Sequence, residues 1–332
     1  MSTSVTRVVP ARVGLVGNPS DGYAGAVVAA PLPQRAATVT VRPADGVVIA
    51  GPGVEHGWPS LDAFVESVTA VGHPASQRIL TASLSVMIEH VVDHLAERGS
   101  GPARPVRLDW ATTVPRSVGL AGSSALAVAA IRSLADVWDV SLDPRVVAAL
   151  ALRAEVSELG IAAGWQDRIV QAVGNPVLVD AAAMEVCDGL EVPGVRELHP
   201  PRALPLVVGW LDSAASGSGR YHGAVRGRAG SLTGPMRELG ELARAAAAAL
   251  DAGAIHRLTE LVDATWKLRQ AVVPLRPDHA ALVEVVRATG VAATTPGSGG
   301  SVVAVPTDSA ALAAVIAALA EHGARWVTSE LR

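Results

Sequence analysis

A segment rich in glycine and serine, residues 113–125, shows the clearest chemistry in this sequence. It reads Thr-Val-Pro-Arg-Ser-Val-Gly-Leu-Ala-Gly-Ser-Ser-Ala and joins a valine-rich run to a helical pattern of Ala, Leu and Val. Glycine leaves backbone N–H groups accessible, and beside a helix N-terminus such groups bind phosphate. The hydroxyls of Ser123 and Ser124 would lie within reach of a phosphate or of its Mg²⁺. The segment therefore predicts a phosphate-binding loop, with an ordinary loop that caps a core helix as the alternative.

This loop cannot use the lysine that belongs to a Walker-type phosphate loop. The only lysine of the chain is Lys267, in a distant helical stretch. A nucleotide bound here would be held by backbone N–H groups, hydroxyls and the helix dipole. Two more loops rich in turn residues, 17–25 and 296–300, precede and follow this one along the chain.

A carboxylate follows the phosphate loop at a place suited to proton transfer. Asp167 comes after Gly-Trp-Gln and before an amphipathic run. A carboxylate within hydrogen-bond reach of a hydroxyl can accept its proton as the hydroxyl attacks. Capping of a helix N-terminus is the alternative role for this residue.

Alternating strands and helices must position these loops. Valine enrichment and alternation predict strands over 5–9, 12–16, 26–30, 37–42, 47–50, 106–114, 176–180 and 184–190. Capping residues and apolar periodicity predict helices over 76–98, 125–138 and 143–159, and one that starts at Leu61 behind Ser60. Beyond a proline-rich connection at 194–205, strands are expected at 206–211, 292–294 and 301–305, and helices at 235–252, 256–272, 277–289 and 309–321.

The composition restricts the class of protein. A chain of 332 residues has room for about two domains, and 50% hydrophobic with 17% charged residues is typical of a packed enzyme. A net charge of −4 argues against nucleic-acid and anionic-membrane partners. The single cysteine, Cys187, excludes an internal disulfide and a zinc site with several thiolates. With no apolar run of about 20 residues, a cytoplasmic protein is expected.

The motifs together resemble those of the GHMP kinases, the family of galactokinase, homoserine kinase, mevalonate kinase and phosphomevalonate kinase. Residues 115–125 match the central pattern Pro-x-x-x-Gly-Leu-x-Ser-Ser-Ala with one extra residue. Within this family, residues 11–21, 159–168, 218–226 and 297–300 are similar to motifs of the glucuronokinases.

This resemblance implies an α+β fold with two lobes. The N-terminal lobe, residues 1–195, would carry the phosphate loop and the catalytic base, and the C-terminal lobe, residues 196–332, would be ferredoxin-like. The active site would lie in the cleft between them, with ATP and Mg²⁺ as cofactors.

The resemblance also implies roles for individual residues. Asp167 matches the catalytic carboxylate, and Arg12 matches the basic residue of the opening motif. The residues expected to bind ATP are Pro115, Gly119, Leu120, Ala121, Gly122, Ser123, Ser124, Ala125, Gly297, Ser298, Gly299 and Gly300. The residues expected to bind substrate are Asn18, Asp21, Tyr23, Arg168, Arg220, His222 and Arg226.

The metal is expected to bind Ser124 and one carboxylate. Glu155 and Glu158 lie three positions apart on one helix face; Glu155 is nearer to the spacing that the resemblance implies, and Glu158 is the alternative. For Asp21 a simple Asp-Gly turn is the alternative to sugar binding. Each basic substrate-binding candidate has a surface or phosphate-facing charge as its alternative.

The reaction that these motifs predict is ATP-dependent phosphorylation of the anomeric hydroxyl of a uronic acid, with D-glucuronate as the expected substrate. A guanidinium binds a carboxylate through two hydrogen bonds, which a kinase for neutral sugars does not need. The alternatives are a related kinase for galacturonate, a neutral sugar or a hydroxy acid, and a non-catalytic sensor of sugar or nucleotide. The expected partners are a small sugar acid and ATP, and the sequence leaves the oligomeric state open.

Overall fold

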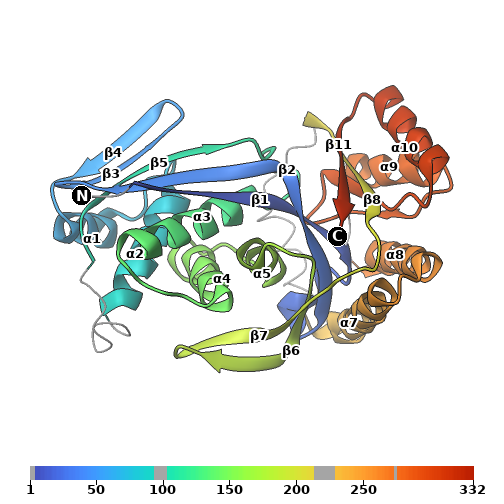
Figure 1. Cartoon of the computed structure of the whole chain (residues 1–332), viewed down its shortest axis with the longest axis horizontal. Coiled ribbons are helices and arrows are strands. Elements are labelled where there is room, and N and C mark those ends of the chain that lie inside the picture. The colour runs from blue at the N-terminus through green and yellow to red at the C-terminus, as the bar shows by residue number, and fades with distance from the viewer. Residues whose placement is uncertain (1–3, 93–102, 213–228, 273–274) are drawn as a thin grey trace.

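The computed structural model describes residues 4–92, 103–212, 229–272 and 275–332. These residues form two β-sheets that lie side by side along the long axis of the molecule (Figure 1), each with its own set of helices. The mixed architecture confirms the predicted α+β class.

The first sheet has seven strands and is built on the long strand β2 (Ala26–Pro43), with β1 (Val5–Val16) antiparallel along it. The sheet order is β4-β3-β5-β2-β6-β7. These strands are β3 (Val47–Gly51), β4 (Val54–Trp58), β5 (Val106–Thr112), β6 (Val177–Cys187) and β7 (Leu190–Glu197). The expected strands 5–9 and 12–16 form one strand, because the register shifts at Pro10 and Ala11 without ending the pairing.

Helices pack on one face of this sheet. They are α2 (Arg78–His90), α3 (Gly122–Val137), α4 (Pro144–Arg153) and α5 (Gln166–Val173), while α1 (Leu61–Val71) follows β4. Two predicted caps are confirmed: Ser60 accepts a hydrogen bond from the N–H of Ala63, and Asp143 accepts one from that of Arg145. The predicted helix end near residue 98 lies outside the described residues.

The second sheet is antiparallel, with the order β11-β8-β10-β9. Its strands are β8 (Leu204–Trp210), β9 (Ala293–Thr294), β10 (Ser301–Ala304) and β11 (Arg325–Leu331). Helices α7 (Ala229–Asp251), α8 (Ile255–Val272) and α9 (Pro277–Arg287) connect β8 to β9, and α10 (Ser309–Glu321) connects β10 to β11. The strand order, counted along the chain, is 4-1-3-2, which is that of the predicted ferredoxin-like lobe.

Three strands, β4, β7 and β11, were not expected from the sequence, and the two strands expected at 176–180 and 184–190 form the single strand β6. All three unexpected strands lie at sheet edges and bury few side chains, with exposed residues such as Glu55 and Arg325 among them. An edge strand with few buried side chains lacks the clear apolar alternation that predicts a strand. Helix α7 also begins at Ala229, before its predicted start at Pro235.

The two sheets share a hydrophobic core. On β2, Val27 and Ala29 pack with α2 to α5, whereas Ala26 and Val28 pack with α7, α8 and β8. This division follows the two-residue period of a strand, whose successive side chains point to opposite faces. Strand β7 ends at Glu197 and β8 begins at Leu204. The expected domain boundary between residues 195 and 196 stays a prediction. Within the described residues, no helix has the length and apolarity needed to cross a bilayer.

Candidate active site

A cavity of about 1010 Å³ receives residues from all three loops that the sequence analysis singled out. Its wall also includes the α1–α2 connection, β5 and the segment before α5. The predicted site residues on this wall are Arg12, Asn18, Asp21, Tyr23, Pro115, Gly119, Leu120, Ala121, Gly122, Ser123, Glu155, Asp167, Arg168 and Ser298. Segments as far apart in the sequence as Arg12 and Ser298 therefore meet around one space.

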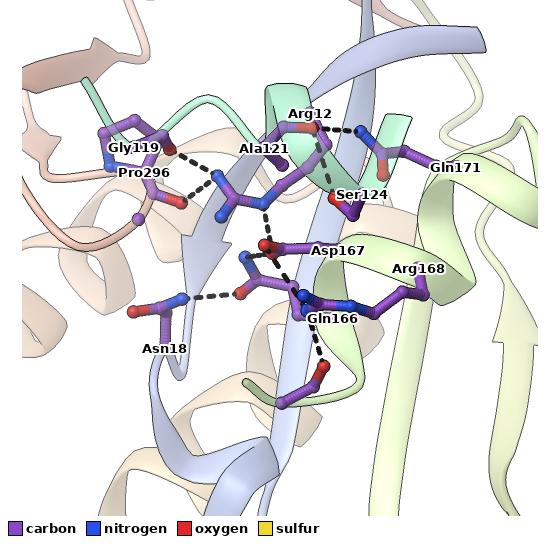
Figure 2. A network of polar contacts seen from close by, with 12 residues as sticks. Arg12, Asn18, Gly119, Ala121, Ser124, Gln166, Asp167, Arg168, Gln171 and Pro296 are labelled. Atoms are coloured by element: carbon purple, nitrogen blue, oxygen red, sulfur yellow. Dashed lines mark hydrogen bonds and ion pairs between the residues drawn. The ribbon is translucent and has the colours of Figure 1, made fainter. Parts of the chain in front are cut away.

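Arg12 joins three of these segments (Figure 2). It lies on β1 and is only 4% exposed. Its Nε donates to Oδ1 of Asp167 at 2.5 Å, and its Nη1 donates to the carbonyl oxygens of Gly119 at 2.6 Å and Pro296 at 3.0 Å. A buried guanidinium needs such partners to offset its desolvation. The cation of Arg12 thus holds the candidate base against both glycine loops.

Asp167 lies in the first turn of α5. The N-cap position of this helix is Trp165, and no side chain caps it, so Asp167 does not have the capping role. Its Oδ1 accepts from Arg12 and, at 3.3 Å, from Nε2 of Gln166. Its Oδ2 lies 3.6 Å from Nη1 of Arg168, beyond hydrogen-bond distance. Within the described part of the chain, Oδ2 is therefore the oxygen left for a substrate hydroxyl.

Asp21 is held against the same helix. It lies in the short 3₁₀ helix η1 (Ser20–Tyr23), and its Oδ2 accepts from the backbone N–H of Gln166 at 2.8 Å. Burial raises the pKa of Asp21, while the bond from Gln166 and the charges of Arg168 and Arg12 oppose this shift. A side chain at Gly164 would overlap the Asp21 carboxylate, so this glycine permits the contact. Asp21 is thus tied to α5, which a simple turn does not require.

The phosphate loop ends at an open helix N-terminus. Helix α3 begins after Ala121, which has a left-handed backbone with φ of 62° and gives no side-chain cap. The first N–H groups of α3 therefore lie next to the cavity without a capping side chain, as anion binding requires. Ser124 is fully buried and its hydroxyl donates to the carbonyl of Ala121 at 3.1 Å, whereas Ser123 lines the cavity.

The structure separates the two glutamates that the sequence left open. Glu155 lies in the π-helical turn η4 (Ala154–Glu158), and its Oε1 accepts from Ser123 Oγ at 2.7 Å. Its other oxygen pairs with the guanidinium of Arg168. Glu158 instead faces His73, whose Nε2 lies 3.2 Å from its Oε2. Glu155 is therefore the carboxylate at the phosphate loop.

Burial lowers the pKa of Arg168 to about 9, and the nearby positive charge of Arg12 acts in the same direction. At neutral pH Arg168 remains a cation. Its Nη1 also donates to the carbonyl of Gly164 at 2.8 Å. The guanidinium of Arg168 is bonded to Glu155 and to the carbonyl of Gly164, so in this structure Arg168 forms part of the cavity wall.

The residues at the phosphate loop fit a bound Mg²⁺. A carboxylate and a hydroxyl, those of Glu155 and Ser123, adjoin each other at the cavity wall, and oxygen is the ligand atom that Mg²⁺ takes. No group of three or more His, Cys, Asp or Glu side chains forms a metal cluster in the described ranges, and Mg²⁺ keeps few protein ligands. When bound, the ion would neutralise phosphate charge beside the N-terminus of α3.

We expect Glu155→Gln to raise the Mg²⁺ concentration needed for half-maximal activity by about 10-fold, because a neutral amide is a weaker ligand than a carboxylate. Glu158→Gln should change this concentration by less than about 2-fold. A titration of activity with MgCl₂ at saturating substrates measures both. Thermal unfolding of each variant separates this effect from the loss of the buried pair with Arg168, and an equal rise for Glu158→Gln would contradict the assignment.

The second glycine loop packs directly on the first. A Cβ at Gly119, which has φ of 77°, would lie 2.8 Å from the carbonyl oxygen of Gly299 and 3.1 Å from the N–H nitrogen of Ser298. Ser301 Oγ donates to the carbonyl of Val118 at 2.6 Å. The loop at 296–300 thus packs against the phosphate loop mainly on the side away from the cavity, and Ser298 is its residue on the cavity wall.

Some predicted residues cannot be placed, and some site residues were not predicted. Arg220, His222 and Arg226 lie outside the described residues. Gln166 and Arg269, which contact Asp167 and Asn18 respectively, were not singled out. The signal for Arg269 was an arginine on the mainly apolar face of α8, in register with Val262 and Trp266.

Comparison with known proteins places this architecture. The chain matches the family models for the GHMP kinases N terminal domain over residues 86–175 and for GHMP kinases C terminal over residues 236–325. It is 31% identical over 308 residues to glucuronokinase 1 of Arabidopsis thaliana, which covers 88% of this chain and 82% of that protein. Probable glucuronokinase 2 of the same plant is 30% identical with the same coverage.

A solved structure agrees on the fold. Streptococcus pneumoniae phosphomevalonate kinase in complex with phosphomevalonate and AMPPNP superposes with a TM-score of 0.79 at 15% sequence identity, over 98% of this chain and 99% of that chain. The two family models, the coverage of the relatives and the shared fold lead to one conclusion: this chain is a kinase that belongs to the GHMP kinase family.

Proposed function

We propose that this protein uses ATP to phosphorylate the anomeric hydroxyl of a uronic acid, D-glucuronate, and so forms glucuronate 1-phosphate. The observation that carries the proposal is the Asp167 carboxylate, held by Arg12 beside the phosphate loop, in a chain 31% identical to a glucuronokinase. ATP follows from membership of the family.

The geometry suits in-line transfer of a phosphoryl group. Oδ1 of Asp167 is occupied by two donors, so Oδ2 can accept the proton of the sugar hydroxyl. The hydroxyl oxygen then bonds to the γ-phosphorus, the bond from that phosphorus to the β-γ bridging oxygen breaks, and ADP leaves. The N–H groups at the start of α3 lie where the negative charge of the phosphates would be stabilised.

The charge of the cavity supports an acidic acceptor. Four arginines and three carboxylates line it, and Arg12 and Arg168 each pair with a carboxylate. The other two, Arg78 and Arg116, form no ion pair with any carboxylate in the described residues. Their guanidinium groups supply positive charge that a triphosphate together with a sugar carboxylate would neutralise.

The test is ADP release with Mg·ATP across glucuronate, galacturonate, galactose, glucose and homoserine. We expect kcat/KM for glucuronate to exceed that for galactose and glucose by about 10-fold or more, because a neutral sugar offers no carboxylate to the guanidinium groups of Arg78 and Arg116 and so loses a charge-assisted hydrogen bond. Faster turnover of galacturonate, a neutral sugar or homoserine would overturn the proposed acceptor and retain the kinase. ATP binding without turnover of any acceptor would identify a sensor instead.

A further inference from the structure

A buried arginine of the second lobe, Arg269, contacts the loop at residues 17–25 of the first lobe. Arg269 lies on α8 and is completely buried. Its Nη1 donates to Asn18 Oδ1 at 2.8 Å and to the carbonyl of Thr295 at 3.1 Å, and its Nη2 donates to the carbonyl of Gly297 at 2.8 Å. Arg269 does not line the cavity, so it contacts no substrate there.

The guanidinium determines how the next side chains must point. Arginine has only N–H donors, so Asn18 must present its oxygen to Arg269 and its NH₂ group to the other side. That NH₂ group donates to Gln166 Oε1 at 3.0 Å, which leaves the Gln166 NH₂ group to donate to Oδ1 of Asp167 (Figure 2). Both amides thus have one orientation that satisfies every donor and acceptor in the chain of bonds.

The glutamine at the end of this chain has little freedom. Gln166 is 1% exposed, and its backbone N–H is held by Asp21. Its amide packs closely against β1 at Gly14: a Cβ added to this glycine would lie only 2.8 Å from Gln166 Oε1. If this amide rotated by half a turn about its last bond, it would present an oxygen to the Asp167 carboxylate, and the two acceptors would repel each other.

We propose that Arg269 is a positioning residue for the candidate base and acts through Asn18 and Gln166. This inference rests on the proposed role of Asp167 as the base. The hydrogen bonds from Arg269 to Asn18, to Gln166 and on to Asp167 form a relay. This relay makes Oδ1 of Asp167 the oxygen that accepts from Arg12 and Gln166, and it thereby keeps Oδ2 for the substrate hydroxyl. Asn18, which the sequence predicted to bind substrate, is in this view a link of the relay, since both ends of its amide are engaged.

Three substitutions break the relay at different links. Asn18→Asp keeps an oxygen for Arg269 but cannot donate to Gln166, so it tests the relay while it retains the cation's partner. Gln166→Leu removes the last amide, and Arg269→Lys keeps the charge with fewer donors. Arg287→Lys is the matched control, because Arg287 also lies on a helix of the second lobe, α9, and also donates to a backbone carbonyl, that of Ala293 at 3.2 Å.

We expect Asn18→Asp and Gln166→Leu each to lower kcat by about 10-fold, with KM for ATP and sugar within about 2-fold of wild type. In the Gln166→Leu background, Asn18→Asp should lower kcat by less than about 2-fold more, because its effect passes through the missing amide. Arg269→Lys should retain more activity than Arg269→Met, and Arg287→Lys should leave kcat within about 2-fold of wild type.

Steady-state kinetics of these variants, with thermal unfolding to confirm folding, decide the matter. Independent effects that multiply in the double variant would overturn the relay, and so would a rise in sugar KM at constant kcat for Asn18→Asp, which would assign Asn18 to substrate binding. The kinetics use whichever acceptor the wild-type protein turns over fastest. A wrong acceptor class therefore overturns the proposed substrate and leaves this test intact.

Discussion

Asp167→Asn is expected to lower kcat by about 10³-fold while KM for ATP changes by less than about 3-fold. An amide oxygen at this position is a poor base, so the proton of the attacking hydroxyl has no acceptor in the transition state. The phosphate loop does not depend on that carboxylate charge, because Arg12 also donates to the carbonyls of Gly119 and Pro296. Steady-state kinetics with ADP release measure both constants.

The chain offers a closely matched control for this substitution. Asp136 accepts from Nε of Arg7 at 2.6 Å, close to the 2.5 Å of the Arg12–Asp167 pair, but this pair is at the surface and Asp136 is not on the cavity wall. Asp136→Asn should leave kcat within about 2-fold of wild type, since an exposed ion pair contributes little. If Asp167→Asn retained a tenth or more of the wild-type kcat, Asp167 would not be the base.

Gly297→Ala is expected to lower kcat/KM for ATP by about 100-fold, because it forces the two glycine loops apart. A Cβ at this position would overlap the carbonyl oxygen of Gly119 and lie 3.0 Å from both terminal nitrogens of Arg12. The clash is with backbone, so side-chain rotation cannot relieve it, and a displacement of about 1 Å at the site has this order of effect. Kinetics at varied ATP, together with the affinity for a non-hydrolysable analogue, measure the loss.

The control for Gly297→Ala is another glycine-to-alanine change with space around it. A Cβ at Gly234, within α7, meets nothing within 4 Å. Gly234→Ala should keep kcat/KM and raise the free energy of unfolding by up to about 1 kcal/mol, since alanine is the better helix former. Wild-type kinetics for Gly297→Ala would show that close contact between the loops is not required.

Much of the fold followed from local patterns. The caps at Ser60 and Asp143 and most helices were predictable because the residues that begin a helix are neighbours in sequence. The strands β4, β7 and β11 were missed because an edge strand buries too few side chains to show alternation. Two expected strands form the single strand β1 for another reason: a bulge interrupts the alternation of side chains in the sequence but not the hydrogen-bonded pairing with β2.

The sequence by itself determined which residues meet at the phosphate loop, because its glycines, serines and following helix are contiguous. It also identified Arg12 and Asp167 as a candidate pair, through motifs that each occupy one short segment. Their direct contact at 2.5 Å, across 155 positions, required the pairing of β1 with β2 and the packing of α5 beside them.

Only the tertiary structure showed that Glu155, which the resemblance favoured, contacts the phosphate loop while Glu158 contacts His73, and that the hydroxyl bonded to Glu155 is that of Ser123. The two glutamates share one helix face in sequence, but the π-helical turn at 154–158 directs one toward the phosphate loop and the other toward His73. The connection from Arg269 to Asn18 was equally hidden, because it spans 251 positions and two lobes. Sequence periodicity reports which face of a helix is buried, whereas the partner of a buried polar group is set by the elements that fold against that face.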